Sequence, residues 1–253
     1  MLYLDYLAYN NALKHVSIHE KILLGWGCLI LSLVLPRPFT LLCIILLMHS
    51  VMLYAKISPR YLLRLWMAPL AFLLVGLVTV AVSFGTMPFS AIASTKVGSY
   101  YLGITAQGIM TAKGLFLRSA AAVSCLFMVA TTTPIAHITA FAARIKALNT
   151  VMEISLLTYR FIFVFLETAA QIYTAQQSRL GYSSTKRSLR SLTMLAANLC
   201  SKSFITARDL YTALLARNYS DKLVYRYPRQ DISLIRLIAI VAVLISVALT
   251  ATL

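Results

Sequence analysis

Charged side chains are scarce in this sequence, and acidic ones are scarcer still. Of 253 residues only 12% are charged, against about a quarter in an average soluble domain. Uncharged runs such as Leu65–Thr95 and Ser119–Ala143 exceed the roughly 20 residues that cross a bilayer as a helix. A soluble protein can bury one such run in its core, but not several. The shortage of charge therefore excludes an ordinary soluble domain and predicts a multi-pass membrane protein.

Motifs of catalysis and metal binding are also absent. The sequence has no H-E-x-x-H, G-x-S-x-G or P-loop pattern, so we expect neither an intramembrane enzyme nor ATP hydrolysis by this chain. Its four cysteines stand singly, as packing residues do. His15 and His19 make half a metal site at most, and His49 is the one histidine inside a predicted crossing. We predict no catalytic residue, no cofactor and no metal ligand; a self-contained metal-ion carrier is the alternative.

The formal net charge of +16 is of a size that nucleic-acid-binding proteins show. Most Lys and Arg residues, however, lie between or beside the apolar runs, where the positive-inside rule places them on the cytosolic side. We therefore expect the lipid bilayer and no nucleic acid as a partner. Anionic lipid and an acidic protein surface are the candidates for any basic residues that topology does not explain.

The apolar runs predict about five transmembrane helices. These runs are Ile22–Leu35, Phe39–Ala55, Leu65–Phe84, a run that ends near Thr133, and Ile232–Leu253. The first is short for a crossing, so its helix is expected to begin earlier, with Lys21 extending to the membrane interface. The stretch from Gly85 to Gly108 is rich in Gly, Ser, Thr and Tyr and suits an ordered external loop.

The positive-inside rule supports this topology. With five crossings and a cytosolic N-terminus, only Arg37, Lys96, Lys113 and Arg118 fall toward the outside. The other nineteen of the 23 basic residues fall on the cytosolic side.

A long segment between the fourth and the last crossing has a different character. From Ile135 to Tyr227 it contains no proline and one glycine, Gly181, which favours long helices with a single break. Hydropathy alone would send Val151–Tyr173 across the membrane. Glu153, Arg160 and Glu167 are seven residues apart, however, and so form one polar stripe along an amphipathic helix. We predict an interfacial or cytosolic helix here; a spanning helix with a buried charge pair is the alternative.

The predicted fold is therefore an all-α polytopic membrane protein with a cytosolic or interfacial arm of long amphipathic helices. Residues 1–133 are expected to form the first four transmembrane helices, residues 134–231 the arm, and residues 232–253 the last transmembrane helix.

Within the arm, a short motif occurs twice at an offset of 38 residues. Thr174-Ala175-Gln176-Gln177-Ser178-Arg179 corresponds to Thr212-Ala213-Leu214-Leu215-Ala216-Arg217, and each copy is followed by a turn residue and Tyr-Ser. Gly181 and Asn218 can supply the left-handed conformation that ends a helix. Each arginine is thus expected at a helix end. Helix capping would explain one such arginine, but two matching copies favour a paired docking device.

The whole chain resembles the transmembrane (T) component of energy-coupling factor (ECF) transporters, a kind of ABC importer, in their cobalt/nickel CbiQ-type branch. The residues that carry the resemblance are Asp5-x-x-Ala8-x-x-Asn11-Ala12-Leu13, Glu20-Lys21, Leu117-Arg118-Ser119-Ala120, Thr131-Thr132-Thr133-Pro134, Leu157-Thr158-Tyr159-Arg160-Phe161-Ile162-Phe163, and the two x-Arg-x motifs Ser178-Arg179-Leu180 and Ala216-Arg217-Asn218. The motifs depart from the family's frequent Ala-Arg-Gly form, because Leu180 and Asn218 stand where glycine is common.

The resemblance implies a function in the bacterial or archaeal plasma membrane. The helices that end at Arg179 and Arg217 would be coupling helices, each docking on one of two ABC ATPase subunits. The stripe of Glu153, Arg160 and Glu167 would pass ATP-driven motion to a small membrane substrate-binding (S) subunit of the metal-binding CbiM type, with or without an accessory membrane subunit. The implied cargo is cobalt or nickel; a T component that serves another micronutrient is the alternative.

Overall fold

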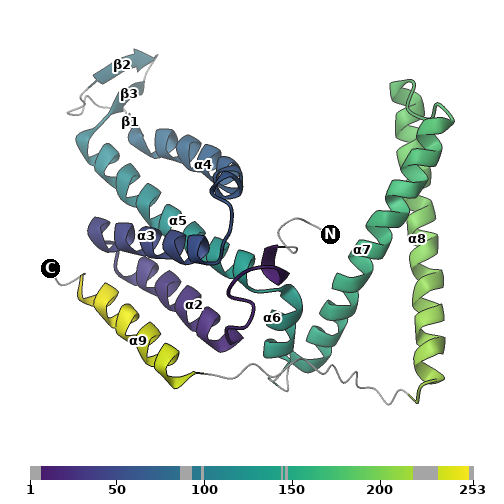
Figure 1. The fold of residues 1–253 in the computed structure, drawn as a ribbon. Helices are drawn as coiled ribbons and strands as arrows, with labels where there is room; N and C mark the ends of the chain where they lie inside the picture. The colour runs from purple at the N-terminus through teal and green to yellow at the C-terminus, as the bar shows by residue number, and fades with distance from the viewer. Residues whose placement is uncertain are drawn as a thin grey trace. The chain divides into compact units, whose positions relative to one another are not determined.

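The computed structural model describes residues 7–85, 93–97, 100–143, 145, 148–218 and 233–250 (Figure 1). The chain divides into two compact units. One comprises Leu2–Ile135 and Arg229–Leu253 and is called the bundle below; the other is built on Ala136–Pro228 and keeps the name arm. Asp5 of the N-terminal motif, the pair Tyr219-Ser220 and the segment around Pro228 and Asp231 lie outside the described residues.

The bundle consists of five helices and a small sheet. Its helices are α2 (Ile18–Val34), α3 (Pro38–Tyr54), α4 (Pro59–Ala81), α5 (Ala106–Thr132) and α9 (Leu234–Leu249). Helix α5 packs against α2, α3 and α4, while α9 packs against α2 and α3. Pro38 opens α3, where its missing N–H leaves no hydrogen bond unmade, so the short connection after α2 forms a tight hairpin.

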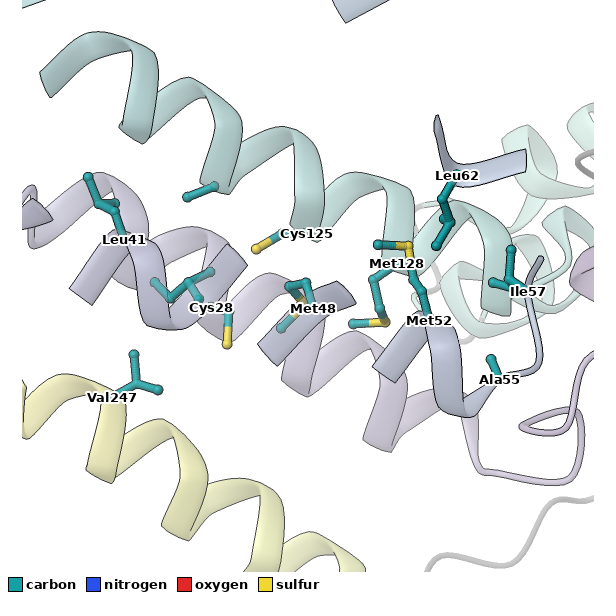
Figure 2. Packing of buried hydrophobic residues seen from close by; sticks show 12 residues of the cluster. Cys28, Leu41, Met48, Met52, Ala55, Ile57, Leu62, Cys125, Met128 and Val247 are labelled. Carbon is teal, nitrogen blue, oxygen red and sulfur yellow. The ribbon is translucent and has the colours of Figure 1, made fainter. Parts of the chain in front are cut away.

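Sulfur-containing, aliphatic and small side chains fill the interior of the bundle. Figure 2 shows Met48 and Met52 of α3 lying close to Met128 of α5, with Val247 pointing inward from α9. Helix α2 approaches α5 so closely that a Cβ at Gly25 would lie 2.3 Å from a methyl carbon of Val129. Small residues allow this approach between membrane helices, where dispersion contacts rather than water exclusion hold the helices together.

The composition of the helices agrees with the predicted fold class. By length and composition, α4 and α5 can each cross a membrane, and α3 and α9 are shorter apolar helices. Helix α4 leaves large apolar side chains uncovered, including Phe72 at 78% exposure and Leu63 at 75%. The protein is an all-α polytopic membrane protein, as predicted. Lys21 departs from expectation, because it is buried within the bundle rather than extended to the interface.

The predicted external loop contains regular structure among its described residues. Strands β1 (Val82–Gly85), β2 (Ala93–Val97) and β3 (Tyr100–Ile104) form an antiparallel sheet in the order β1-β3-β2. Val82 follows the end of α4 and pairs with Ile104, which precedes the start of α5. This strand pairing holds the two helix ends close to each other. The sheet is a small addition to an otherwise helical fold.

The arm contains a short helix, α6 (Ile135–Ala142), and two long ones, α7 (Asn149–Ser178) and α8 (Thr185–Leu215). Helices α7 and α8 pack against each other as an antiparallel hairpin (Figure 1). The break between the two long helices falls at Gly181, where the sequence predicted it, but the end of α6 at Ala142 and the start of α7 at Asn149 make a further break that the sequence did not predict. Ser184 begins α8 as its N-cap, because its side chain accepts a hydrogen bond from the Arg187 backbone N–H.

Candidate functional site

The first arginine motif lies at the C-terminal end of α7, where the backbone forms a Schellman cap. The Gly181 N–H donates to the Gln176 carbonyl at 2.9 Å, and the Leu180 N–H donates to the Gln177 carbonyl at 3.0 Å. Between these bonds, Leu180 adopts a left-handed conformation with φ 56°. This pattern satisfies carbonyl groups that a helix end otherwise leaves without donors. Arg179 is thereby fixed immediately before a sharp reversal of the chain.

The second motif has the same backbone at the end of α8. The Arg217 N–H donates to the Leu214 carbonyl at 3.0 Å, and the Asn218 N–H donates to the Leu215 carbonyl at 3.1 Å. The equivalent bonds at the first end join Arg179 to Gln176 and Leu180 to Gln177. Asn218 also has φ 56°. The 38-residue repeat is thus a repeat of three-dimensional structure as well as of sequence.

The position of the left-handed residue at the first end corrects an expectation. The sequence predicted this conformation at Gly181, but the structure gives it to Leu180. Glycine is needed at 181 for a different reason: a Cβ there would lie 2.7 Å from Ser191 Oγ and 2.8 Å from the Gln176 carbonyl oxygen. The start of α8 therefore approaches the end of α7 too closely for any side chain at this position.

A small polar network joins the two helices at this point. Gln176 Nε2 donates to the Ser191 carbonyl at 3.0 Å, and Ser191 Oγ donates to the Gly181 carbonyl at 2.9 Å. The Tyr182 hydroxyl donates to Gln176 Oε1 at 2.8 Å. Desolvation, and then the nearby Tyr173, raise the pKa of Tyr182 above its ordinary value of 10, so this donor stays protonated at neutral pH. Apart from Gly181, sequence reasoning did not find this network.

All six residues of the two motifs lie at the surface. Ser178, Arg179, Leu180, Ala216, Arg217 and Asn218 are exposed. Within the part of the chain that the structure describes, neither the Arg179 nor the Arg217 guanidinium forms an ion pair or a side-chain hydrogen bond. Two fixed arginine forks therefore remain available to an external acceptor.

The hairpin holds the two motifs far apart. Arg179 lies where α7 turns into α8, and Arg217 lies at the opposite end of α8 (Figure 1). Because α8 has 31 residues and a helix rises about 1.5 Å per residue, its ends are separated by about 46 Å. The two arginines are thus too far apart to share one small binding site.

The polar stripe of α7 lies on one continuous helix, as its spacing requires. Arg160 and Glu167 are exposed and Glu153 is half-buried. On the opposite side of the same helix, Val151, Ile162 and Leu166 are also exposed, with 44% to 53% of their surface accessible. Helix α7 is therefore amphipathic, with exposed residues on both of these sides.

His49, the histidine inside a predicted crossing, is occupied within the bundle. Trp66 Nε1 donates to its Nε2 at 3.0 Å, and its Nδ1 lies 2.8 Å from the Ile45 carbonyl. Since Nε2 accepts, Nδ1 carries the proton and donates, so the ring is neutral and has no free lone pair. Among the described residues, no group of three or more His, Cys, Asp or Glu side chains is placed to hold a metal ion.

Fold and site together define a class: a polytopic helical membrane protein with a helix-hairpin arm that displays two equivalent arginine helix ends. The sequence model of the CbiQ family, described as cobalt transport protein, matches residues 10–226. The chain therefore belongs to the CbiQ family of cobalt transport proteins.

Curated relatives agree with this assignment. The cobalt transport protein CbiQ of Salmonella typhimurium is 33% identical over 217 residues, which cover 85% of this chain and 96% of the relative. The protein of the same name from Rhodobacter capsulatus is 32% identical over 224 residues, covering 87% of this chain and 85% of the relative. A putative fused cobalt transport protein CbiMQ from Methanocorpusculum labreanum is 28% identical over 217 residues; the match covers 85% of this chain and 36% of that protein.

Proposed function

We propose that this chain is the energy-coupling transmembrane subunit of an ECF-type ABC importer for cobalt or nickel. It acts in the plasma membrane of a bacterium or archaeon, with its N-terminus and arm in the cytosol. The observation that carries the proposal is the pair of structurally equivalent, exposed arginine ends about 46 Å apart on one helix hairpin. The chain catalyses no reaction itself, and ATP hydrolysis belongs to its partners.

Arginine suits the docking step at each helix end. Its planar guanidinium offers a rigid fork of donors that pairs with a carboxylate through two parallel hydrogen bonds. At Arg179 and Arg217 this fork follows a capped helix end, so little backbone freedom is lost on binding. Each end enters a groove on one of two ABC ATPase subunits. When ATP draws the ATPases together, the grooves move and carry the two helix ends with them.

Helix α7 passes this motion to the substrate-binding subunit. The charged stripe of Glu153, Arg160 and Glu167 and the opposite apolar face give α7 two open surfaces. One surface contacts a small membrane S subunit, whose reorientation releases the ion inward. A CbiM-type partner is supported by the fused relative, whose name joins CbiM and CbiQ in one chain. Ion selection then belongs to the S subunit, so cobalt and nickel are distinguished there.

Charge reversal at both helix ends tests the proposal. The chain is co-expressed with two ABC ATPase subunits and a CbiM-type S subunit, and ATPase recovery and uptake of radioactive cobalt are measured. The variant R179E/R217E is expected to recover no ATPase and to transport no cobalt above background. The control R190E/K202E makes the same change in net charge on exposed residues of α8 and should retain both activities. Full transport by R179E/R217E would show that the arginine ends are not the docking device.

A further inference from the structure

Two adjacent charged residues in the first turn of α2 have no part in the docking proposal. Glu20 is 1% exposed and Lys21 is 6% exposed, although both carry full charges at neutral pH in ordinary surroundings. Burying a charge is costly unless partners replace its water. Both residues have such partners, and the partners lie at the two places where the chain leaves and re-enters the bundle.

Lys21 holds the end of α5. Its Nζ donates to the Thr132 carbonyl at 2.9 Å, and Asn11 Nδ2 lies 3.3 Å from the same oxygen. Helix α5 ends at Thr132, and Pro134 brings no N–H that could continue the helical ladder. The last carbonyls therefore need donors from elsewhere, and a cation is favourable at the negative end of the helix dipole.

Glu20 holds the start of α9. Its Oε1 accepts a hydrogen bond from the Ser233 backbone N–H at 3.0 Å, and its Oε2 forms an ion pair with Arg236 Nε at 3.2 Å. Ser233 is the N-cap of α9 but makes no capping bond with its own side chain. The carboxylate thus lies beside the N-termini of both α2 and α9, where the helix dipoles favour a negative charge.

Both sets of contacts lie next to the arm in the sequence. The end of α5 leads into the arm, and the start of α9 follows the arm's return. Neighbouring residues of a single helical turn therefore fasten both attachment points of the arm to α2. The signs of the charges fit this arrangement: the cation meets a helix C-terminus, and the anion meets helix N-termini.

We propose that Glu20 and Lys21 are positioning residues that keep the two bundle helix ends adjoining the arm in sequence, the end of α5 and the start of α9, fixed while the arginine ends of the arm move. This inference rests on the proposed function. With a fixed base, displacement of Arg179 and Arg217 swings the arm as a lever. Without it, the end of α5 and the start of α9 yield, and ATP hydrolysis is no longer converted into movement of the S subunit. Loss of these Glu20 and Lys21 contacts, called the anchors below, should therefore uncouple cobalt transport from ATP hydrolysis without preventing assembly of the complex.

The test measures cobalt uptake and phosphate release by the same purified complex in proteoliposomes. K21M removes the donor, and E20Q/R236Q removes the ion pair without leaving a lone charge. Both variants should retain the ATPase subunits, while cobalt taken up per ATP hydrolysed falls about fivefold or more, as expected for loss of a typical coupling free energy. K21R, which keeps a cationic donor, should restore most of the ratio, and R64M, which removes an exposed cation of α4, should leave it unchanged.

The opposite results would overturn the proposal. If uptake and hydrolysis fall in parallel, or if uptake per ATP is unchanged, Glu20 and Lys21 do not position the arm for coupling. E20Q/R236Q leaves no lone buried charge and still decides the question should K21M not fold. A wild-type ratio in E20Q/R236Q, together with unfolded K21M, would assign the residues to stability alone.

A second measurement separates this inference from the docking proposal. Hydrogen exchange of the purified wild-type and K21M chains is compared without any partner. K21M should exchange faster in the last turn of α5, and E20Q/R236Q should do so at the start of α9. If wild-type chain recovers no ATPase, the docking proposal fails while this exchange result still decides whether the anchors exist. Unchanged exchange at both places would contradict the anchors even where docking holds.

Discussion

The two arginine ends have the same backbone but reach it by different means. Both present a left-handed residue at φ 56° directly after the arginine. At the second end this residue is Asn218, a residue type that tolerates the conformation. At the first end it is Leu180, whose Cβ makes a left-handed conformation unfavourable by about 1–2 kcal/mol. The left-handed conformation therefore has a small free-energy cost at Asn218 and a larger one at Leu180.

The surroundings of the two ends explain how the strain is tolerated. At the first end, Gln176, Tyr182 and Ser191 tie the turn to α8 through side-chain hydrogen bonds. The position equivalent to Gln176 in the second copy is Leu214, which has no group to make such bonds. Tertiary contacts thus fix the first end, and local preference supports the second. Equal geometry from unequal side chains fits the proposed docking of both ends on two similar surfaces.

Single charge reversals provide the strongest test of this equivalence. R179E and R217E should each weaken the affinity of the chain for the ATPase subunit by about 30-fold or more, since a docking arginine typically contributes at least 2 kcal/mol to binding. The two losses should agree within a few-fold because the backbones match. Affinity for the purified ATPase is measured by titration, with R190E as the control. A large loss for one reversal and none for the other would break the equivalence.

Substitution of Gly181 should remove the tertiary support of the first end. The Cβ of valine would overlap Ser191 Oγ and the Gln176 carbonyl, at 2.7 Å and 2.8 Å. Such overpacking typically costs about 1–3 kcal/mol. G181V should therefore speed hydrogen exchange at the end of α7 and the start of α8, but not at the end of α8. G114A is a suitable control, because nothing lies within 4 Å of that added methyl group. Unaltered exchange in G181V would show that the close approach is not maintained.

The sequence was sufficient for the features that depend on local patterns. Apolar runs and scarce charge predicted an all-α polytopic membrane protein, and the family comparison and the helices confirm it. The lack of proline and glycine predicted two long helices with a break at Gly181, and α7 and α8 meet there. Each pattern has its cause within a few turns of helix, so neighbouring residues alone reveal it.

Features that depend on distant contacts were not predictable in this way. Glycine propensity placed the left-handed residue at 181, but the structure gives that conformation to Leu180, and the contact with Ser191 is what requires glycine at 181. Lys21 was expected at the interface, yet its partner is Thr132, 111 positions along the chain. The sheet between α4 and α5 depends on Val82 pairing with Ile104, which no local pattern specifies.

Replacing Gln176 by leucine should make the first end resemble the second. Q176L removes the bonds to the Ser191 carbonyl and to the Tyr182 hydroxyl. Because these groups are only partly buried, and water can replace a lost partner, the cost should be about 1 kcal/mol. Hydrogen exchange in the α7–α8 turn is expected to rise about fivefold, and the mirror substitution L214Q should change the second end little. An equal effect of both substitutions would show that the network does not distinguish the two ends.

The smallest expected effects come from relieving the left-handed positions themselves. L180G should stabilise the first turn by about 1 kcal/mol, since glycine adopts positive φ without a Cβ penalty. N218G should gain only a few tenths of a kcal/mol, because asparagine already tolerates this conformation. The two gains are compared as the slowing of hydrogen exchange in the residues of each turn. The gain at Leu180 must exceed that at Asn218 if strain is stored at the first end alone. Equal gains would mean that the network around Gln176 supports a turn that was not strained.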